Sequence, residues 1–170
     1  PPLLSGLVGS EMCIRDRLGS NAYFIRSIRN DRGKEGGVTK KNYPEIKYRQ
    51  AKEYIKRYQG YGTPTISTQV TRTAELKYKS EVTNPNVFVE AGDHNFLDVK
   101  QIQLQSGRNF TKSENESGVF LAIIGAKVKS TLFKNNEDPI NKFFSARGNK
   151  FKVIGVLEEQ GSSFGGGGDN

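Results

Sequence analysis

Cysteine is almost absent from this chain: Cys13 is the only one among 170 residues, and it lies beside the only methionine, Met12. The stretch around it, residues 7–17, follows neither the spacing of an amphipathic helix nor the alternation of a strand. A transposon-end adapter used in sequencing-library preparation translates to the same residues. We therefore expect residues 1–17 to be a non-native segment and leave them out of the fold prediction. Without Cys13, the chain offers no thiolate metal site, thiol nucleophile or disulfide.

Long apolar runs are also missing. The chain is 34% hydrophobic, its mean hydropathy is −0.63, and no run approaches the roughly 18–20 apolar residues that a membrane span needs. Residues 18–170 are long enough for one domain, or for two small subdomains, with a hydrophobic core. We expect no internal repeat and no membrane-spanning segment within them.

Histidine occurs once, as His94, with Asp93 beside it. A nucleophile and its base must point toward one another, whereas neighbours on a strand or turn point apart. These two residues with Asp98 would form at best a weak, oxygen-rich metal site. The glycine run at 165–168 lacks the Gly-Lys-Ser/Thr that opens a phosphate-binding helix. We therefore predict no enzymatic activity and no catalytic, cofactor-binding or metal residues.

Positive charge is concentrated in one segment. The formal net charge is +8, and eleven Lys and Arg against four Asp and Glu lie between Arg26 and Arg57. One interpretation is a nucleic-acid footprint, and the other is a solvated loop and helix face. No RNP-like, zinc-finger or Gly-x-x-Gly clamp motif accompanies the charge. A small basic nucleic-acid-binding domain therefore stays as the alternative hypothesis.

The first half of the chain predicts the order strand, helix, strand, strand. Aromatic and β-branched residues at 21–28 favour a strand, and the Gly-rich stretch 29–42 favours a loop. The apolar spacing of Ala51, Ile55 and Tyr58 predicts an amphipathic helix over 46–58. Lys47 stands at its start, where it gives only a weak cap.

A strand region is predicted over 65–91. Within it, Ala74, Leu76 and Tyr78 alternate with charged residues, the pattern of a half-buried strand. A turn at 83–86 followed by a strand over 86–92 predicts a hairpin.

The second half predicts a short strand at 102–105 and a loop at 106–118. The apolar run 119–124 favours a strand buried on both faces. A short helix is expected over 125–133, with Val128, Leu132 and Phe133 on one side. A hairpin should turn at 147–149, and residues 161–170 should form a flexible tail or loop.

Seven short motifs follow one another along residues 18–170. They are LGSN (18–21), IKYRQA (46–51), VFVEAGDHNF (87–96), a G-R-x-F motif (107–110), AIIGAKVKSTLF (122–133), DPINKFF (138–144) and FKVIGVL (151–157). In this order they resemble the motifs of the periplasmic core domain of MacB/FtsX-type ABC transporter permeases. Departures from the family pattern fall at Lys47, Glu90, Ala91 and Asn141. The positions carried over as structural motif residues are Gly19, Asn21, Gly107, Arg108, Phe110, Gly125, Phe133, Asp138, Pro139 and Gly155.

This resemblance implies an α+β fold. It implies a membrane-near βαβ-type subdomain that begins with residues 18–97 and a smaller β-rich outer subdomain over 98–170, both truncated at the C-terminus. The domain would lie at the periplasmic face of the bacterial inner membrane, without catalytic residues or cofactors. Loops at 106–118 and 161–168 are its expected contact surface.

The resemblance also implies a function. The domain would transmit ATP-driven conformational change to the periplasm for efflux or for export of a lipoprotein or other substrate. Its partners would be a second permease in a homodimer or heterodimer and a separate or fused cytoplasmic ATPase domain. A periplasmic adaptor, a lipoprotein or the substrate would be further partners, and no nucleic acid is expected.

Overall fold

The computed structural model describes residues 13–14, 23–27 and 44–159 and divides the chain into two compact units, 1–62 and 63–170. Helices and strands are mixed along it, which confirms the α+β class. Gly19, Asn21 and the tail 161–170 lie outside the described residues. The subdomain boundary expected between 97 and 98 stays a prediction.

The first unit contains two antiparallel strands of two residues each. Strand β1 (Cys13–Ile14) pairs with β2 (Tyr23–Phe24). The strand predicted for 21–28 is therefore present but short, because residues 25–27 are not in a strand. Strand β1 lies within residues 1–17, the segment expected to be non-native. The non-native origin of that segment stays a prediction.

Helix α1 (Tyr48–Arg57) confirms the helix predicted for 46–58. Its N-cap, Lys47, makes no side-chain cap hydrogen bond, which agrees with the weak cap expected there. Instead the Lys47 N–H donates to Oε1 of Gln50 at 2.9 Å. Near the other end Arg57 and Glu53 form an ion pair at 2.6 Å across one helical turn.

The second unit begins with four strands, β3 (Ser67–Ala74), β4 (Leu76–Tyr78), β5 (Glu81–Val82) and β6 (Val87–Gly92). The predicted alternation is confirmed, since Ala74, Leu76 and Tyr78 are buried and the residues between them are exposed. The strand predicted over 86–92 pairs antiparallel with β3, within the strand region predicted before it. The hairpin expected to turn at 83–86 is wrong, because β4 and β5 lie between β3 and β6 in sequence. Strand β4, which carries Leu76 and Tyr78, pairs with β5 and β9 instead.

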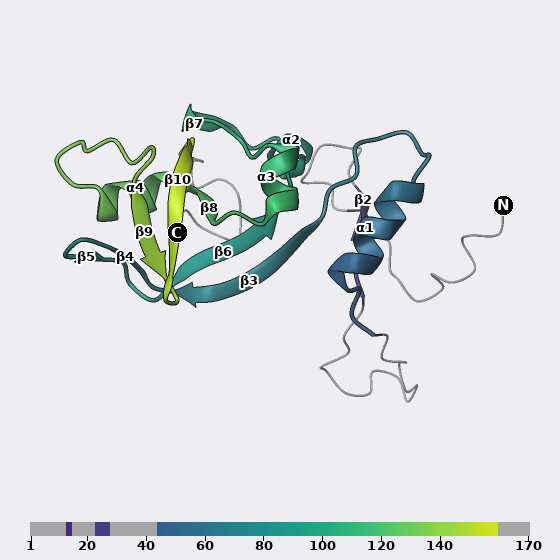
Figure 1. The fold of residues 1–170 in the computed structure, drawn as a ribbon, viewed down its shortest axis with the longest axis horizontal. Coiled ribbons are helices and arrows are strands. Elements are labelled where there is room, and N and C mark those ends of the chain that lie inside the picture. Colours follow the sequence, from purple (N-terminus) through teal and green to yellow (C-terminus); the bar gives the residue numbers. More distant parts are fainter. Residues whose placement is uncertain (1–12, 15–22, 28–43, 160–170) are drawn as a thin grey trace. The chain divides into compact units, whose positions relative to one another are not determined.

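The remaining elements are α2 (Phe96–Lys100), β7 (Leu104–Gly107), α3 (Lys112–Ser117), β8 (Leu121–Ile124), α4 (Ala126–Leu132), β9 (Phe143–Ala146) and β10 (Asn149–Leu157). Strand β10 is central, because it pairs with β7, β8 and β9 (Figure 1). Lys152 faces both β8 and β9, and Gly155 faces both β7 and β8. Parallel β8 therefore occupies one edge of β10, and antiparallel β9 and β7 follow each other along the other edge.

The loop predicted for 106–118 is wrong in part, because it contains helix α3. Thr111 accepts a hydrogen bond from the Glu114 N–H, and the Glu114 carboxylate accepts one from the Thr111 N–H at 2.9 Å. This reciprocal capping box satisfies N–H groups that a helix start leaves without partners. It stabilises a helix despite the many polar residues of the segment.

The strand predicted over 119–124 is shorter and less buried than expected. Val119 and Phe120 are 55% and 56% exposed and precede β8. Within β8 only Ile124 is fully buried. The physical reason is its position: among the described residues β8 pairs with β10 alone, so it lies at an edge of the sheet.

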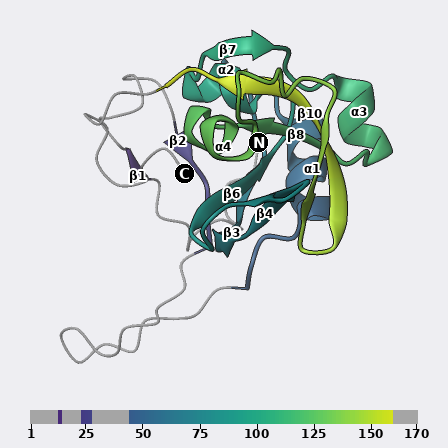
Figure 2. The same ribbon diagram turned by 90° about the vertical axis from the view of Figure 1, so that its left-hand side faces the viewer.

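Helix α4 supplies one side of the hydrophobic core. Val128, Leu132 and Phe133 are all buried, as the spacing predicted, and they cluster with Val153 and Val156 of β10. The β9–β10 hairpin confirms the turn predicted at 147–149, and Figure 2 shows it as a long projecting ribbon. Both turn residues, Arg147 and Gly148, have positive φ, which matches the right-handed twist of the strands.

Candidate functional site

Two glycines of the family motifs meet where β7 ends against β10. Gly107 lies directly opposite Gly155 in the antiparallel pair. Gly107 has a φ of +82°, and a Cβ there would lie 2.7 Å from the Gly155 Cα and closer still to the Ile154 carbonyl oxygen. A side chain at 107 would therefore collide with the backbone of β10. The glycine lets the two strands approach more closely than any other residue would allow.

The backbone continues this contact one residue further. The Arg108 N–H donates to the Ile154 carbonyl oxygen at 2.9 Å. A Cβ on Gly155 would lie 2.9 Å from the Arg108 carbonyl oxygen, so this glycine also admits a close backbone. Residues 107–108 and 154–155 thus form one tight backbone contact, which we call the β7–β10 junction.

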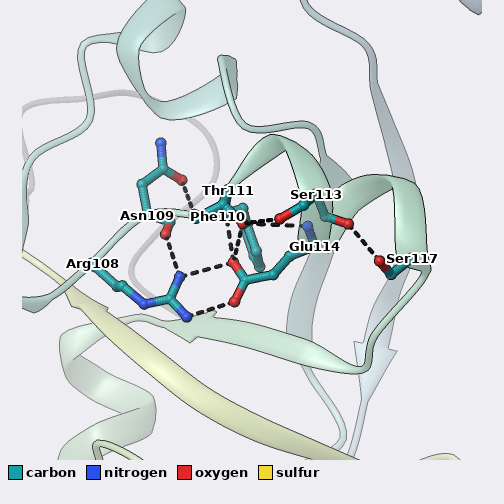
Figure 3. Close-up of polar contacts among 7 residues, drawn as sticks. All are labelled: Arg108, Asn109, Phe110, Thr111, Ser113, Glu114 and Ser117. Atoms are coloured by element: carbon teal, nitrogen blue, oxygen red, sulfur yellow. Dashed lines mark hydrogen bonds and ion pairs between the residues drawn. The ribbon is translucent and has the colours of Figure 1, made fainter.

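An ion pair joins the junction to α3. Figure 3 shows the Arg108 guanidinium facing the Glu114 carboxylate, with N–O distances of 2.8 and 2.6 Å. This bidentate geometry is the strong form of the contact. The Arg108 hydrogen bonds, followed by the Thr111 N–H, lower the pKa of Glu114 to about 2. The same hydrogen bonds raise the pKa of Arg108 above its usual value.

Asn109 connects the junction to the segment before α2. Its Nδ2 donates to the His94 carbonyl oxygen at 2.8 Å, and its Oδ1 accepts from the Phe110 N–H at 2.7 Å. Both Asn109 and Phe110 are half-buried. The G-R-x-F motif therefore contacts three neighbours, β10, α3 and the chain before α2.

The other described motif residues lie elsewhere in the same unit. Gly125 is the N-cap residue of α4, and the Phe133 ring lies 4.4 Å from that of Tyr78, between centroids. Asp138 accepts a hydrogen bond from the Ile140 N–H at 3.0 Å, and Pro139 is fully buried. The structure places Gly107, Arg108 and Gly155 in one contact, with Phe110 two residues further along the chain. The side chain of Ile140, the residue after Pro139, also reaches this contact, 2.9 Å from the Gly107 Cβ position.

A second polar cluster ties the β4–β5 hairpin to the connection after α4. Glu137 accepts hydrogen bonds from the Tyr78 hydroxyl at 2.9 Å and from Lys79 at 3.1 Å, and Lys142 lies 3.5 Å away. The Tyr78 hydroxyl first, and then Lys79, lower the pKa of Glu137. Sequence reasoning missed both Glu137 and Glu114. For Glu114 the Thr-x-x-Glu spacing was a readable signal, whereas nothing local pointed to Glu137.

Asp93 forms hydrogen bonds with groups other than the His94 side chain. The Asp93 carboxylate accepts from the N–H groups of Ile66 and Asn95 and from the Thr65 hydroxyl, so it organises the local loop. His94 Nδ1 is buried and has no hydrogen-bond partner within the described part of the chain. Among residues 13–14, 23–27 and 44–159 no three potential metal ligands gather.

Within residues 13–14, 23–27 and 44–159, no helix is long and apolar enough to cross a bilayer.

Comparison with known proteins agrees with this architecture. The family described as the MacB-like periplasmic core domain matches residues 13–170. The chain is 26% identical over 105 residues to the macrolide export ATP-binding/permease protein MacB of Hahella chejuensis. It is 32% identical over 78 residues to the pyoverdine export ATP-binding/permease protein PvdT of Pseudomonas savastanoi pv. phaseolicola. These alignments cover 62% and 46% of this chain, but only 16% and 12% of those proteins.

Two solved structures share the fold. The extracellular domain of the noncanonic ABC-type transporter YknZ from Gram-positive bacteria matches with a TM-score of 0.56 and 28% identity, over 65% of this chain and 56% of that one. The periplasmic region of MacB from Actinobacillus actinomycetemcomitans matches with a TM-score of 0.56 and 17% identity, over 74% and 56%. With the family match over nearly the whole sequence, the conclusion is that this chain belongs to the MacB-like periplasmic core domain family.

Proposed function

We propose that this domain transmits ATP-driven conformational change from an ABC transporter to the extracytoplasmic space during export. As a member of its family, the chain is a component of a MacB-type export transporter and lies outside the cytoplasm, near the inner membrane. Its proposed partners are a second permease subunit and a cytoplasmic ATPase domain. A periplasmic adaptor, a lipoprotein or the exported molecule would contact it from outside.

The β7–β10 junction is the observation that carries this proposal. An element that transmits motion must move as a stiff body, because hinge and shear motions displace packed units whole. The junction links the central strand β10 to β7 through glycines at close approach, and Arg108 extends the link to α3. These residues are the family's own motif positions, and their contacts are with other elements of the same unit.

Two relatives suggest which classes of exported substrate to test first. Their names describe export of macrolides and of pyoverdine. Resistance of cells carrying the full-length transporter to a panel of macrolides and other toxic compounds would first identify an exported compound.

The coupling role can then be tested with two glycine variants in the full-length transporter. Gly107→Ala loosens the junction, and Gly148→Ala changes a glycine with the same φ of +82° in an open turn. We expect Gly107→Ala to lower export at least fivefold while ATP hydrolysis stays within twofold and Gly148→Ala leaves both unchanged. Equal loss of export and hydrolysis, or full export by Gly107→Ala at normal protein levels, would refute the coupling role.

A further inference from the structure

Asp93 fastens the chain at the point where it enters the second unit. That unit begins at residue 63. The Asp93 carboxylate accepts a hydrogen bond from the Thr65 hydroxyl and another from the Ile66 N–H, the latter at 3.0 Å. In return the Asp93 N–H donates to the Ile66 carbonyl oxygen at 3.1 Å. Any displacement that arrives along the chain from residues 1–62 therefore meets Asp93 within a few residues.

Asn95 provides a second fastening at the same place. Its Nδ2 donates to the Pro64 carbonyl oxygen at 3.1 Å, and its own N–H donates to the Asp93 carboxylate at 3.1 Å. These side chains and the segment 64–66 that they hold are all half-buried. We call residues 64–66 with Asp93 and Asn95 the entry latch.

One side chain leads from the entry latch to the β7–β10 junction. His94 directly follows Asp93, and its carbonyl oxygen accepts a hydrogen bond from Asn109 Nδ2 at 2.8 Å. Asn109 directly follows Arg108, as Figure 3 shows. The Arg108 N–H donates to the Ile154 carbonyl oxygen of β10 at 2.9 Å. The path from the latch to the central strand therefore crosses only two hydrogen bonds.

The other route from the latch runs along the β3–β6 ribbon to its base in the core. Ala74 and Val87 pair at that base, and both are buried. Before it the register shifts twice, between Gln69 and Thr71 and between Thr71 and Ala74. Such irregularities leave residues unpaired and let a strand bend. The ribbon is therefore the more compliant of the two routes.

We propose that Asp93 and Asn109 are positioning residues, through which a displacement of the entering chain reaches the β7–β10 junction. The inference rests on the coupling role proposed above and assigns the side chains that carry it. Energetic coupling between separate sites is transmitted by packed or hydrogen-bonded elements that join them, and it is demonstrated by perturbing one site and measuring the other. Neither residue belongs to the structural motif positions carried over from the family.

Asp93→Asn opens the latch with almost no change in size. One carboxylate oxygen accepts from the Thr65 hydroxyl and the Asn95 N–H, and the other accepts from the Ile66 N–H. The amide puts a donor in place of one oxygen, so in either orientation one backbone N–H loses its acceptor. We expect hydrogen exchange of the Ile66 or the Asn95 amide to accelerate about tenfold or more.

The Arg108 amide, at the other end of the path, is the decisive readout. In the 170-residue chain, Asp93→Asn should accelerate its exchange about threefold or more relative to the Val153 amide. Val153 is fully buried on β10 and donates to the Lys142 carbonyl oxygen at 2.9 Å, so it reports unfolding of the whole unit. An Arg108 response no larger than that of Val153 would overturn the proposal.

Asn109 variants test which route carries the response. Asn109→Asp removes the Nδ2 donor and keeps the Oδ1 acceptor of the Phe110 N–H. In this background Asp93→Asn should no longer change the exchange of Arg108 relative to Val153. An undiminished response would mean that the β3–β6 ribbon carries the displacement, which contradicts the assigned path. Asn109→Ala gives the same comparison if Asn109→Asp fails to fold.

Glu137→Gln is the matched control for Asp93→Asn. It also replaces a half-buried carboxylate, which accepts hydrogen bonds from Tyr78 and Lys79, with its amide. The exchange of Arg108 relative to Val153 should stay unchanged. An equal acceleration by this variant would mean that loss of any such carboxylate loosens the junction, and the assigned path would be wrong.

Export by the full-length transporter separates this inference from the coupling role. Asp93→Asn should lower export about threefold or more while ATP hydrolysis stays within about twofold. Loss of export in Gly107→Ala but not in Asp93→Asn would overturn the latch path and leave the coupling role standing. Full export by both variants would refute the coupling role and this inference with it.

Discussion

Replacing Gly107 with alanine should destabilise the second unit more than the small size of the added methyl group suggests. The added methyl group meets the backbone of β10, with the Gly155 Cα only 2.7 Å from the Cβ position and the Ile154 carbonyl oxygen nearer still. A backbone neighbour cannot rotate away as a side chain can. The two strands must therefore separate, or the Arg108-to-Ile154 hydrogen bond must lengthen.

The size of the effect follows from two contributions. An alanine at a φ of +82° costs about 1–2 kcal/mol, because its Cβ crowds the following carbonyl. Forcing an extra carbon into a closely packed site costs about 1–3 kcal/mol more. The gain from a less flexible unfolded chain, about 0.4–1 kcal/mol, opposes both. We expect a net loss of about 2–4 kcal/mol in the free energy of unfolding.

Gly148→Ala is the matched control. Gly148 has the same φ of +82°, but nothing lies within 4 Å of its Cβ position. Its loss should be about 1 kcal/mol, since the conformational cost and the entropy gain are the same and only the collision is missing. The difference between the two losses in the free energy of unfolding measures the cost of the collision between the added Cβ and β10.

Urea unfolding of the 170-residue chain, followed by far-UV circular dichroism, measures both variants. Midpoints are compared at a common slope, so that a change in midpoint reports a change in stability. Equal losses for Gly107→Ala and Gly148→Ala would refute the argument, because the backbone contact would then contribute nothing. A loss confined to Gly148→Ala would mean that the register of β7 against β10 is different.

Three further predictions concern the core and the Arg108 cluster. Leu132→Ala, at a site 1% exposed, should cost about 2–5 kcal/mol in thermal unfolding, whereas Val119→Ala, at a site 55% exposed, should leave the midpoint nearly unchanged. Thr111→Ala should cost about 1 kcal/mol by urea unfolding, because α3 loses its cap, and Thr111→Ser should restore most of it. Since the pKa of Glu114 is lowered from 4.5 to about 2, its carboxylate stabilises the folded state fully above pH 4.5 and loses that effect as pH falls toward 2. The stability difference between the original chain and Glu114→Gln should therefore shrink over this range, and a constant difference would contradict the Arg108 pairing.

Local patterns identified most elements of this protein. The helix at 48–57 and the alternation of Ala74, Leu76 and Tyr78 follow from periodicity alone, because an exposed helix and a half-buried strand repeat at different intervals. The α4 face was predicted for the same reason, whereas the β9–β10 turn was predicted from the Arg-Gly-Asn stretch at 147–149. Helix α3 was missed, although its Thr-x-x-Glu capping box is a local signal.

By itself the sequence determined the basic amphipathic helix, because its periodicity is local. The ordered motifs over residues 18–170 carried the family resemblance, which implied the α+β class. Only the tertiary structure decided which strands pair with β10 and that Gly107 lies opposite Gly155. It also decided that Val119 and Phe120 are exposed beside an edge strand. Every strand offers the same backbone N–H and C=O groups, so these groups do not specify which strands pair. The pairing is set by side-chain packing across the whole unit, and the spacing of neighbouring residues does not encode it.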